Sequence, residues 1–350
     1  MASTFTGDPP ARRRGWLGRG AKLAAGFAIS ALFLYATISA VPGDKLLAAI
    51  ASADRNWLLV ALAFICVDYA VKVWRWQTML RGLGARVSFA TAAVPFMGCV
   101  ALNNVLPFRA GDVLRVVAFQ KVTNLPTSAQ LSTVLLERLL DLLVLVGLLF
   151  ATITIWRVDV LPAPLLHGIE VASAAIVAAL AIFFTAPGTV GWLSRWAEVR
   201  WPVLRPLTGA LLRLSQAISH LSAPSLLARL FAQSVAAWLL EGGAFLACGY
   251  ALGFAQKPEA ALLALSVGTL STIIPSSPGY VGTFHYFTAM TVAAFGIGEA
   301  ESTAYAVVIH GLLWVSTTGC GLLLLATRGL GVALRSASAR RASLQTEQGS

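Results

Sequence analysis

Long apolar segments recur along the whole chain and restrict its fold more than any other feature. Of 350 residues, 57% are hydrophobic and 12% are charged, and the mean hydropathy is +0.77. Segments of roughly 18 or more apolar residues can cross a bilayer, where only helices and closed barrels satisfy their own backbone hydrogen bonds. Helical segments of this kind predict an all-α, polytopic integral membrane protein, and no polar stretch approaches the roughly 100 residues of a soluble domain.

Six apolar segments are predicted to span the membrane. The first is longer than the roughly 7 to 15 residues of a signal-peptide core, so we expect a retained anchor rather than a cleaved leader. The predicted spans are residues 21–41, 57–76, 127–156, 165–186, 230–252 and 302–326.

Two further apolar segments are interrupted by proline and glycine. Pro107 and Gly111 break residues 88–120, and Pro275 and Gly279 break residues 260–296 with the same Pro-x-x-x-Gly spacing. The helix after the first break would be about 12 Å long, which is too short for a hydrocarbon core of about 30 Å. Each segment is therefore predicted to be a re-entrant helical hairpin, although a loop between two spans would show the same spacing.

The positions of the basic residues indicate the orientation. The net charge of +11 gathers beside apolar segments, which argues against a nucleic-acid partner. The positive-inside rule is obeyed when the basic N-terminus (1–20), the loop 187–229 and the tail 328–350 are cytoplasmic and the two hairpins enter from opposite faces. Opposed hairpins form an inverted repeat, whose paired breaks mark the binding site near the bilayer midplane in many transporters.

Within this arrangement, residues 21–327 form one transmembrane domain with cytoplasmic termini. The loop 187–229 mixes arginine with tryptophan and leucine, which predicts an amphipathic segment on the cytoplasmic leaflet; a plain basic connector fits equally well. The tail 328–350 is expected to be disordered. The four cysteines lie far apart in apolar runs, so we expect neither a disulfide framework nor a metal or cofactor site.

Charged side chains inside apolar segments are costly and are therefore functional candidates. Asp68 and Lys72 share one helical face. Around the first break and in the 127–156 helix, three further cations occur together with three carboxylates: Arg109, Arg115 and Arg138, with Asp112, Glu137 and Asp141. A purely structural ion-pair network would explain this balance.

The functional alternative is that one arginine exchanges its carboxylate for a lipid phosphate, which a guanidinium binds through two parallel hydrogen bonds. Arg109 is the best candidate because it lies at unwound backbone. We expect Arg109 and Glu137 to act on the ligand, and Arg138 and Asp141 to stabilise the fold.

Uncharged polar residues near the breaks are the next candidates. Asn103 and Asn104 are expected to line the same cavity, since amides are costly in lipid. Ser277 is expected to cap a helix that begins at Pro278, leaving the amides that follow free to bind an anion; ordinary capping would explain the same residues. Titratable residues in the second half could form a proton relay or serve only as polar contacts between helices: Glu241, His285 and His310.

Three ordered motifs resemble the flippase-like transmembrane domain of lysylphosphatidylglycerol synthases. They are Asn103–Arg115, Glu137–Asp141 and Pro275–Gly282. The resemblance implies translocation of a polar or isoprenoid-derived lipid between the leaflets of a bacterial cytoplasmic membrane, along a route lined by the matching residues. The chain resembles stand-alone members without the soluble synthase domain, so lipid aminoacylation is not expected.

Two other functions remain open on the residues alone. One is an intramembrane lipid-headgroup transferase that uses Glu137 or Asp141 as a base and Arg109 on phosphate. The other is a non-transporting scaffold that binds a lipid-biosynthesis partner protein. The sequence contains no nucleotide-binding loop or nucleophile motif, which favours a transporter over an enzyme.

The predicted topology can be tested by labelling single cysteines in a cysteine-free variant. Arg200→Cys should resist a membrane-impermeant maleimide added outside intact cells, because position 200 is expected in the cytoplasm. Lys45→Cys, expected outside, is the matched control and should react. Labelling of position 200 from outside would contradict the topology.

Overall fold

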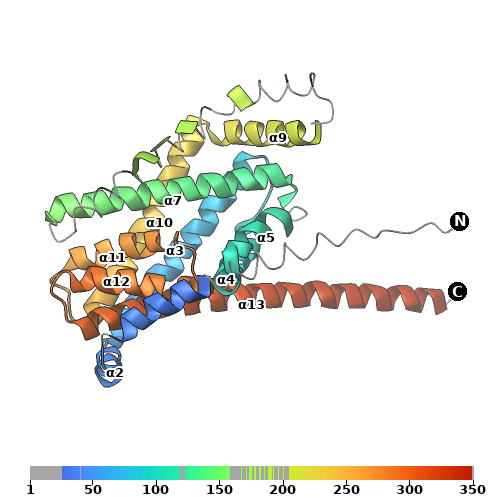
Figure 1. Cartoon of the computed structure of the whole chain (residues 1–350). Helices are drawn as coiled ribbons and strands as arrows, with labels where there is room; N and C mark the ends of the chain where they lie inside the picture. The colour runs from blue at the N-terminus through green and yellow to red at the C-terminus, as the bar shows by residue number, and fades with distance from the viewer. Residues whose placement is uncertain are drawn as a thin grey trace, which may run out of the picture.

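The computed structural model describes residues 26–39, 41–118, 123–157 and 205–348, with individual positions between 167 and 200. Throughout these ranges the regular structure is helical (Figure 1), which confirms the predicted all-α class. The elements, in chain order, are α2 (Gly43–Ala51), α3 (Arg55–Gly82), α4 (Phe89–Val105), η1 (Pro107–Arg109), α5 (Ala110–Ala118), α7 (Thr127–Trp156), α9 (Arg205–Leu221), α10 (Pro224–Ala251), α11 (Pro258–Ser271), η3 (Pro278–Tyr280), α12 (Thr283–Ala293) and α13 (Glu299–Gln348).

Four of the described helices are long and apolar enough to cross a membrane. They are α3, α7, α10 and the first part of α13, up to Thr327, and they match four of the predicted spans. A fifth candidate pairs the helix Gly26–Ile38 with α2 across a bend of 82°. Most of the predicted span 165–186 lies outside the described residues. Large apolar side chains project from these helices, with Leu59 64% exposed and Val315 63% exposed, as contact with lipid requires.

Each broken segment folds into two short helices packed side by side. The pairs are α4 with α5 and α11 with α12. With 17 and 9 residues in the first pair, and 14 and 11 in the second, all four helices are shorter than the roughly 20 residues of a spanning helix. Gly111 allows the close approach of α5 to α4, because a Cβ there would collide with the carbonyl of Cys99.

The two breaks share part of their local structure. Each contains a three-residue 3₁₀ turn that begins with proline, Pro107–Arg109 in one and Pro278–Tyr280 in the other. In both, the last residue of the turn has a left-handed backbone, with φ of 51° for Arg109 and 59° for Tyr280. Tyr280 is therefore the counterpart of Arg109, and the equivalent spacing is Pro278 to Gly282 rather than the expected Pro275 to Gly279.

The second break also begins its helix differently from the prediction. The hydroxyl of Ser277 donates to the Val281 carbonyl at 3.3 Å instead of capping a helix, and the Tyr280 N–H donates to the Ser277 carbonyl at 3.0 Å. The helix starts later, after Gly282, whose N–H donates to Nδ1 of His285 at 3.3 Å. The expected Ser277 cap and free Tyr280 amide are thus wrong, because the hydroxyl and amide bond within the turn.

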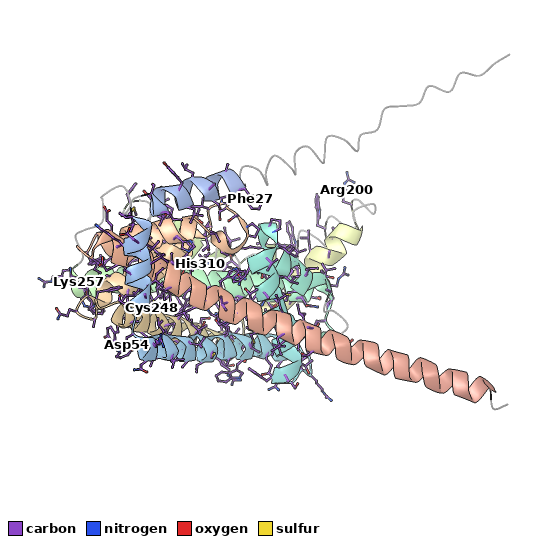
Figure 2. The ribbon with its side chains drawn as sticks, turned by 90° about the horizontal axis from the view of Figure 1, so that it is seen from below. Phe27, Asp54, Arg200, Cys248, Lys257 and His310 are labelled. Atoms are coloured by element: carbon purple, nitrogen blue, oxygen red, sulfur yellow. The ribbon has the colours of Figure 1, made fainter. Side chains whose placement is uncertain are left out.

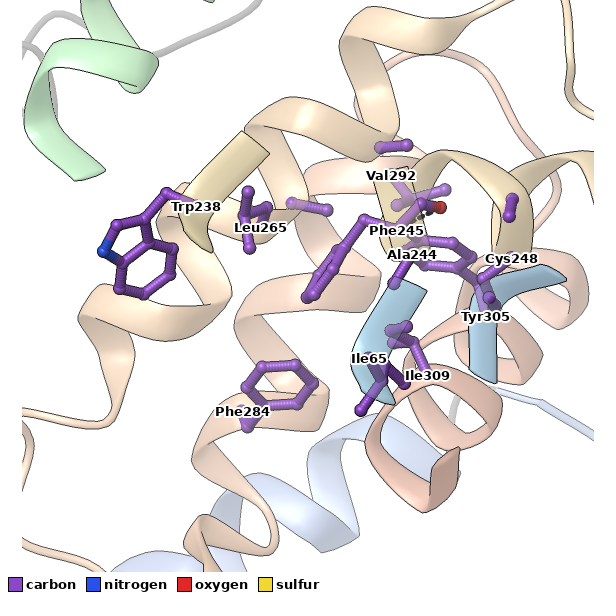
Figure 3. Close-up of a cluster of buried hydrophobic side chains, with 14 of the residues drawn as sticks. Ile65, Trp238, Ala244, Phe245, Cys248, Leu265, Phe284, Val292, Tyr305 and Ile309 are labelled. Atoms are coloured by element: carbon purple, nitrogen blue, oxygen red, sulfur yellow. Dashed lines mark hydrogen bonds between the residues drawn. The ribbon is translucent and has the colours of Figure 1, made fainter. Parts of the chain in front are cut away.

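An apolar core lies where α3, α10, α11, α12 and α13 meet. Phe245 packs edge-on against Phe284 and Tyr305, and the Tyr305 hydroxyl donates to the Phe245 carbonyl at 3.0 Å (Figure 3). The buried phenol has its hydrogen bond satisfied in this way. This core holds the second hairpin against the long helices.

The described part of the loop 187–229 includes α9, one face of which packs on the protein. Ile218 and Leu221 are buried in a cluster with Met79 and Leu136, so α9 packs on α3 and α7, whereas Leu211 is 37% exposed. The helix α13 continues over residues 328–348, where a disordered tail is expected; this stretch is rich in alanine and arginine, which favour helix.

Charged residues expected on opposite faces of the membrane lie at opposite ends of the molecule. Figure 2 places Asp54 and Lys257 at one end and Arg200 toward the other. Asp54 also begins α3, since its carboxylate accepts the N–H of Asn56 at 2.8 Å.

The close contact between α13 and α4 yields a stability prediction. A Cβ at Gly321 would collide with the Met97 carbonyl, whereas one at Gly319, on the same helix, would meet nothing within 4 Å. We expect Gly321→Leu to destabilise the protein by about 1–3 kcal/mol through overpacking. Thermal unfolding in detergent measures this, with Gly319→Leu as the matched control; equal effects of the two would contradict the packing.

Candidate functional site

A cavity of about 220 Å³ lies between the two breaks and the long helices. Among its lining residues are most of the charged residues named above, joined by aromatic side chains that were not predicted. These include Tyr69, Lys72, Arg75, Asn103, Asn104, Arg109, Glu137, Arg138, Asp141, Trp238, Glu241, Tyr280, His310 and Trp314. The cavity is thus a charged site with aromatic walls inside a membrane domain.

Arg75 and Asp141 form the first ion pair of the cavity wall. The Arg75 guanidinium donates to both carboxylate oxygens of Asp141, at 2.6 and 3.2 Å, and to the Ser234 hydroxyl at 2.7 Å. The indole of Trp238 donates to the same carboxylate at 3.1 Å. The pair therefore joins α3 to α7, and its remaining hydrogen bonds reach α10.

Arg75 lies near the end of the predicted span 57–76, and its side chain is 1% exposed. Because α3 extends to Gly82, Arg75 lies inside the helix bundle. Asp68, Lys72 and Arg75 are spaced four and three residues apart, which places them on one helical face. That spacing is the signal that could have identified Arg75.

Arg115 and Glu137 form a second pair that is almost completely buried. Two parallel hydrogen bonds of 3.2 and 3.1 Å join them, with side chains 2% and 3% exposed. The guanidinium also lies over the rings of Phe96 and Trp76, at 5.0 and 5.4 Å. This pair fixes α5 of the first hairpin to α7.

Arg138 pairs with Asp112 but remains partly open to the cavity. Its guanidinium donates to the Asp112 carboxylate at 2.9 and 3.1 Å, while 39% of its side chain is exposed. Glu137 was expected to act on the ligand and Arg138 to stabilise the fold. The structure shows the opposite burial, because Glu137 is the more buried of the two side chains. Glu137 is held by Arg115, and Arg138 presents charge to the cavity.

The two asparagines hold the first break to its neighbours. Asn103 accepts the Asp112 N–H at 3.1 Å and donates to the Asp112 carboxylate at 3.0 Å. Asn104 donates to Thr317 and Thr318 of α13, at 3.2 and 2.9 Å. Both line the cavity as expected, and their amides connect the end of α4 to α5 and α13.

Lys72 has two carboxylate partners. Its ammonium lies 2.8 Å from Asp68 and 2.5 Å from Glu241, and it faces the rings of Tyr69 and Trp238 at 4.7 and 5.1 Å. Aromatic faces and carboxylates both attract a cation. Glu241, a candidate for either a proton relay or a polar contact between helices, lies in an ion pair that joins α3 to α10.

Arg109 has no carboxylate partner within the described residues. Its guanidinium donates to the Thr272 hydroxyl at 3.2 Å and lies 5.4 Å from the centre of the Tyr280 ring. Among the described residues, the charges in the cavity region comprise five cations and five carboxylates, which sum to zero when all are ionised. Lys72 contacts two of the carboxylates, and Arg109 is the cation of this set that contacts none.

His285 and His310 contact each other and not Glu241. Nε2 of His285 lies 3.1 Å from Nδ1 of His310, and His310 lies on α13 within the helix bundle (Figure 2). Because Nδ1 of His285 accepts the Gly282 N–H, its Nε2 carries the proton and donates to His310. This arrangement requires both rings to be neutral. Among the described residues, no three His, Cys, Asp or Glu side chains gather in a group that could hold a metal ion.

Arg109 and Tyr280 also border a second cavity, of about 300 Å³, on the other side of the breaks. The two cavities share Asn103, Arg109, Thr272, Gly279 and Tyr280 as lining residues. The N-terminal helix lines the second cavity through Gly26 and Phe27, and its Ser30 hydroxyl accepts the Ser277 N–H at 2.7 Å. The two breaks thus form a common wall between two chambers.

Comparison with known proteins finds two similar proteins. The chain is 25% identical over 323 residues to "Glycosyltransferase AglD" of Haloferax volcanii, covering 82% of this chain and 51% of the relative. It is 29% identical over 94 residues to "UPF0104 membrane protein PH1989" of Pyrococcus horikoshii, covering 26% and 28%. The chain therefore spans about half the length of the first relative and less of the second.

A match to a protein family covers most of the chain. Residues 23–321 match the family described as the lysylphosphatidylglycerol synthase TM region, a range that contains every ion pair described above. Together with the apolar helices, this match shows a multi-pass membrane protein. The chain belongs to the lysylphosphatidylglycerol synthase TM-region family.

Proposed function

We propose that this protein is a lipid flippase that moves a polar, phosphate-bearing lipid between membrane leaflets. The observation that carries the proposal is Arg109, a cation at the contact of the two breaks that has no carboxylate in contact with it among the described residues. Uncompensated charge within a membrane is costly, and a guanidinium suits a phosphate because it can donate two parallel hydrogen bonds. Arg138, partly exposed in the same cavity, supplies a second cation for the headgroup.

The two chambers give the headgroup a path. They meet at Arg109 and Tyr280, so a shift of one tip relative to the other would open a chamber on one side of the wall and close the other. In this proposal the hairpins are re-entrant and enter from opposite faces of a bacterial cytoplasmic membrane, with both termini in the cytoplasm. The short hairpin helices and the contact between their tips support that arrangement.

A transferase is the second candidate, favoured by the description of the relative AglD as a glycosyltransferase. Such an enzyme would need a base free to take a proton. Glu137 and Asp141 are instead engaged by Arg115 and Arg75, which supports transport over catalysis in this cavity.

Reconstitution into vesicles tests the proposal. We expect exchange of phosphatidylglycerol or a polyprenyl phosphate between leaflets to exceed the protein-free rate, with unchanged lipid mass. Arg109→Ala should lower the rate at least tenfold, and Arg109→Lys should restore part of it because charge remains without the planar fork. Arg86→Ala, an exposed arginine outside the cavity, is the control. Exchange at the protein-free rate for every lipid, together with altered lipid mass, would support the transferase.

Unfolding measurements separate a transporter from a scaffold. Arg115→Met should destabilise the protein by about 3–5 kcal/mol, since it leaves Glu137 buried and unpaired, and adding Glu137→Leu should recover much of the loss. Arg109→Ala should leave the melting temperature nearly unchanged, because no carboxylate depends on Arg109. Equal destabilisation by Arg109→Ala and Arg115→Met would instead indicate that all these charges serve the fold.

A further inference from the structure

An apolar groove of about 270 Å³ runs between α3, α4 and α13. Apart from Ser316 and the two residues at its inner end, its lining is hydrocarbon, aromatic or sulfur-containing, and it includes Ile65, Cys66, Ala70, Phe89, Met97 and Cys320. The groove opens at the surface of the domain, where Cys66 and Cys320 are exposed and Phe89 is 44% exposed. In a membrane-spanning domain this surface faces lipid.

The inner end of the groove is shared with the charged cavity. Tyr69 and Thr317 line both. The Tyr69 ring faces the Lys72 ammonium at 4.7 Å, and the Thr317 hydroxyl accepts the Asn104 amide at 3.2 Å. These two side chains mark the boundary between the apolar groove and the charged cavity.

We infer that the groove binds the hydrocarbon tail of the lipid whose headgroup occupies the charged cavity. This inference rests on the proposed lipid transport. An apolar groove that shares two lining residues with a charged cavity matches a molecule with an apolar tail and a charged head. The groove also gives the lipid a lateral path from the bilayer, between α3 and α13, so the headgroup reaches Arg109 without leaving the membrane.

The shape of the groove favours a tail over a helix of a partner protein. A helix with its side chains is about 10–12 Å wide, and it could cover the opening but not continue past Tyr69 and Thr317. A single chain of methylene groups is narrower than a helix and can extend along the groove to Tyr69 and Thr317. Hydrocarbon is therefore the occupant that matches an apolar groove lying directly beside a charged cavity.

Groove-filling variants test the inference. Ala70→Trp and Cys320→Trp place an indole in the groove from two different helices, and Val67→Trp and Val315→Trp place the same side chain on lipid-facing positions of the same helices, outside the groove. We expect exchange of dipalmitoyl phosphatidylglycerol in phosphatidylcholine vesicles to fall at least tenfold in the groove variants. The control variants should stay within twofold of the unsubstituted protein.

A short-chain probe distinguishes the tail site from the headgroup site. Binding of dibutanoyl phosphatidylglycerol, measured by calorimetry, should be unchanged in Ala70→Trp and Cys320→Trp but at least tenfold weaker in Arg109→Ala. Normal exchange in the groove variants, with intact short-chain binding, would overturn the tail site and leave the flippase proposal standing. Failure of the unsubstituted protein to bind the short-chain probe and to exchange the long-chain lipid would overturn both.

Discussion

The cost of placing charge within a membrane organises this structure. Ion pairs inside a low-dielectric medium are tolerated when both partners are held in good geometry and their other hydrogen bonds are satisfied. Here α7 is the common partner: Asp141 holds Arg75 of α3, Glu137 holds Arg115 of α5, and Arg138 holds Asp112 of α5. Because the charges of α7 select which elements lie beside it, the shape of the cavity follows from these pairings.

The likeness between the two breaks appears in the backbone more clearly than in the side chains. Arg109 and Tyr280 occupy the same position in their turns and share a left-handed φ, which is uncommon for residues other than glycine. Such strain is retained where surrounding contacts determine it, and it concentrates at functional sites. One break thus provides a cation and the other an aromatic ring. The two side chains contact each other within the wall between the chambers.

Local sequence patterns predicted most of the fold and part of the site. Apolar length identified four of the spans, and proline and glycine identified both breaks and drew attention to Arg109. Pairings between distant residues, such as Arg75 with Asp141 and Lys72 with Glu241, have no local signal, because they depend on how helices far apart in the sequence pack. The register of the second break was missed because Pro275 and Pro278 give the same spacing, and only the backbone conformation distinguishes them.

The position of Arg109 also has a consequence for the membrane potential. A path wide enough for a lipid headgroup would ordinarily let protons and sodium ions leak through the bilayer. A fixed positive charge at the narrowest point repels cations electrostatically, as arginine does in water-selective pores. In the proposed transporter, Arg109, with no carboxylate in contact with it among the described residues, would place an electrostatic barrier to cations where the two chambers meet, so that the site proposed to bind an anionic headgroup would also oppose the leak of cations across the membrane.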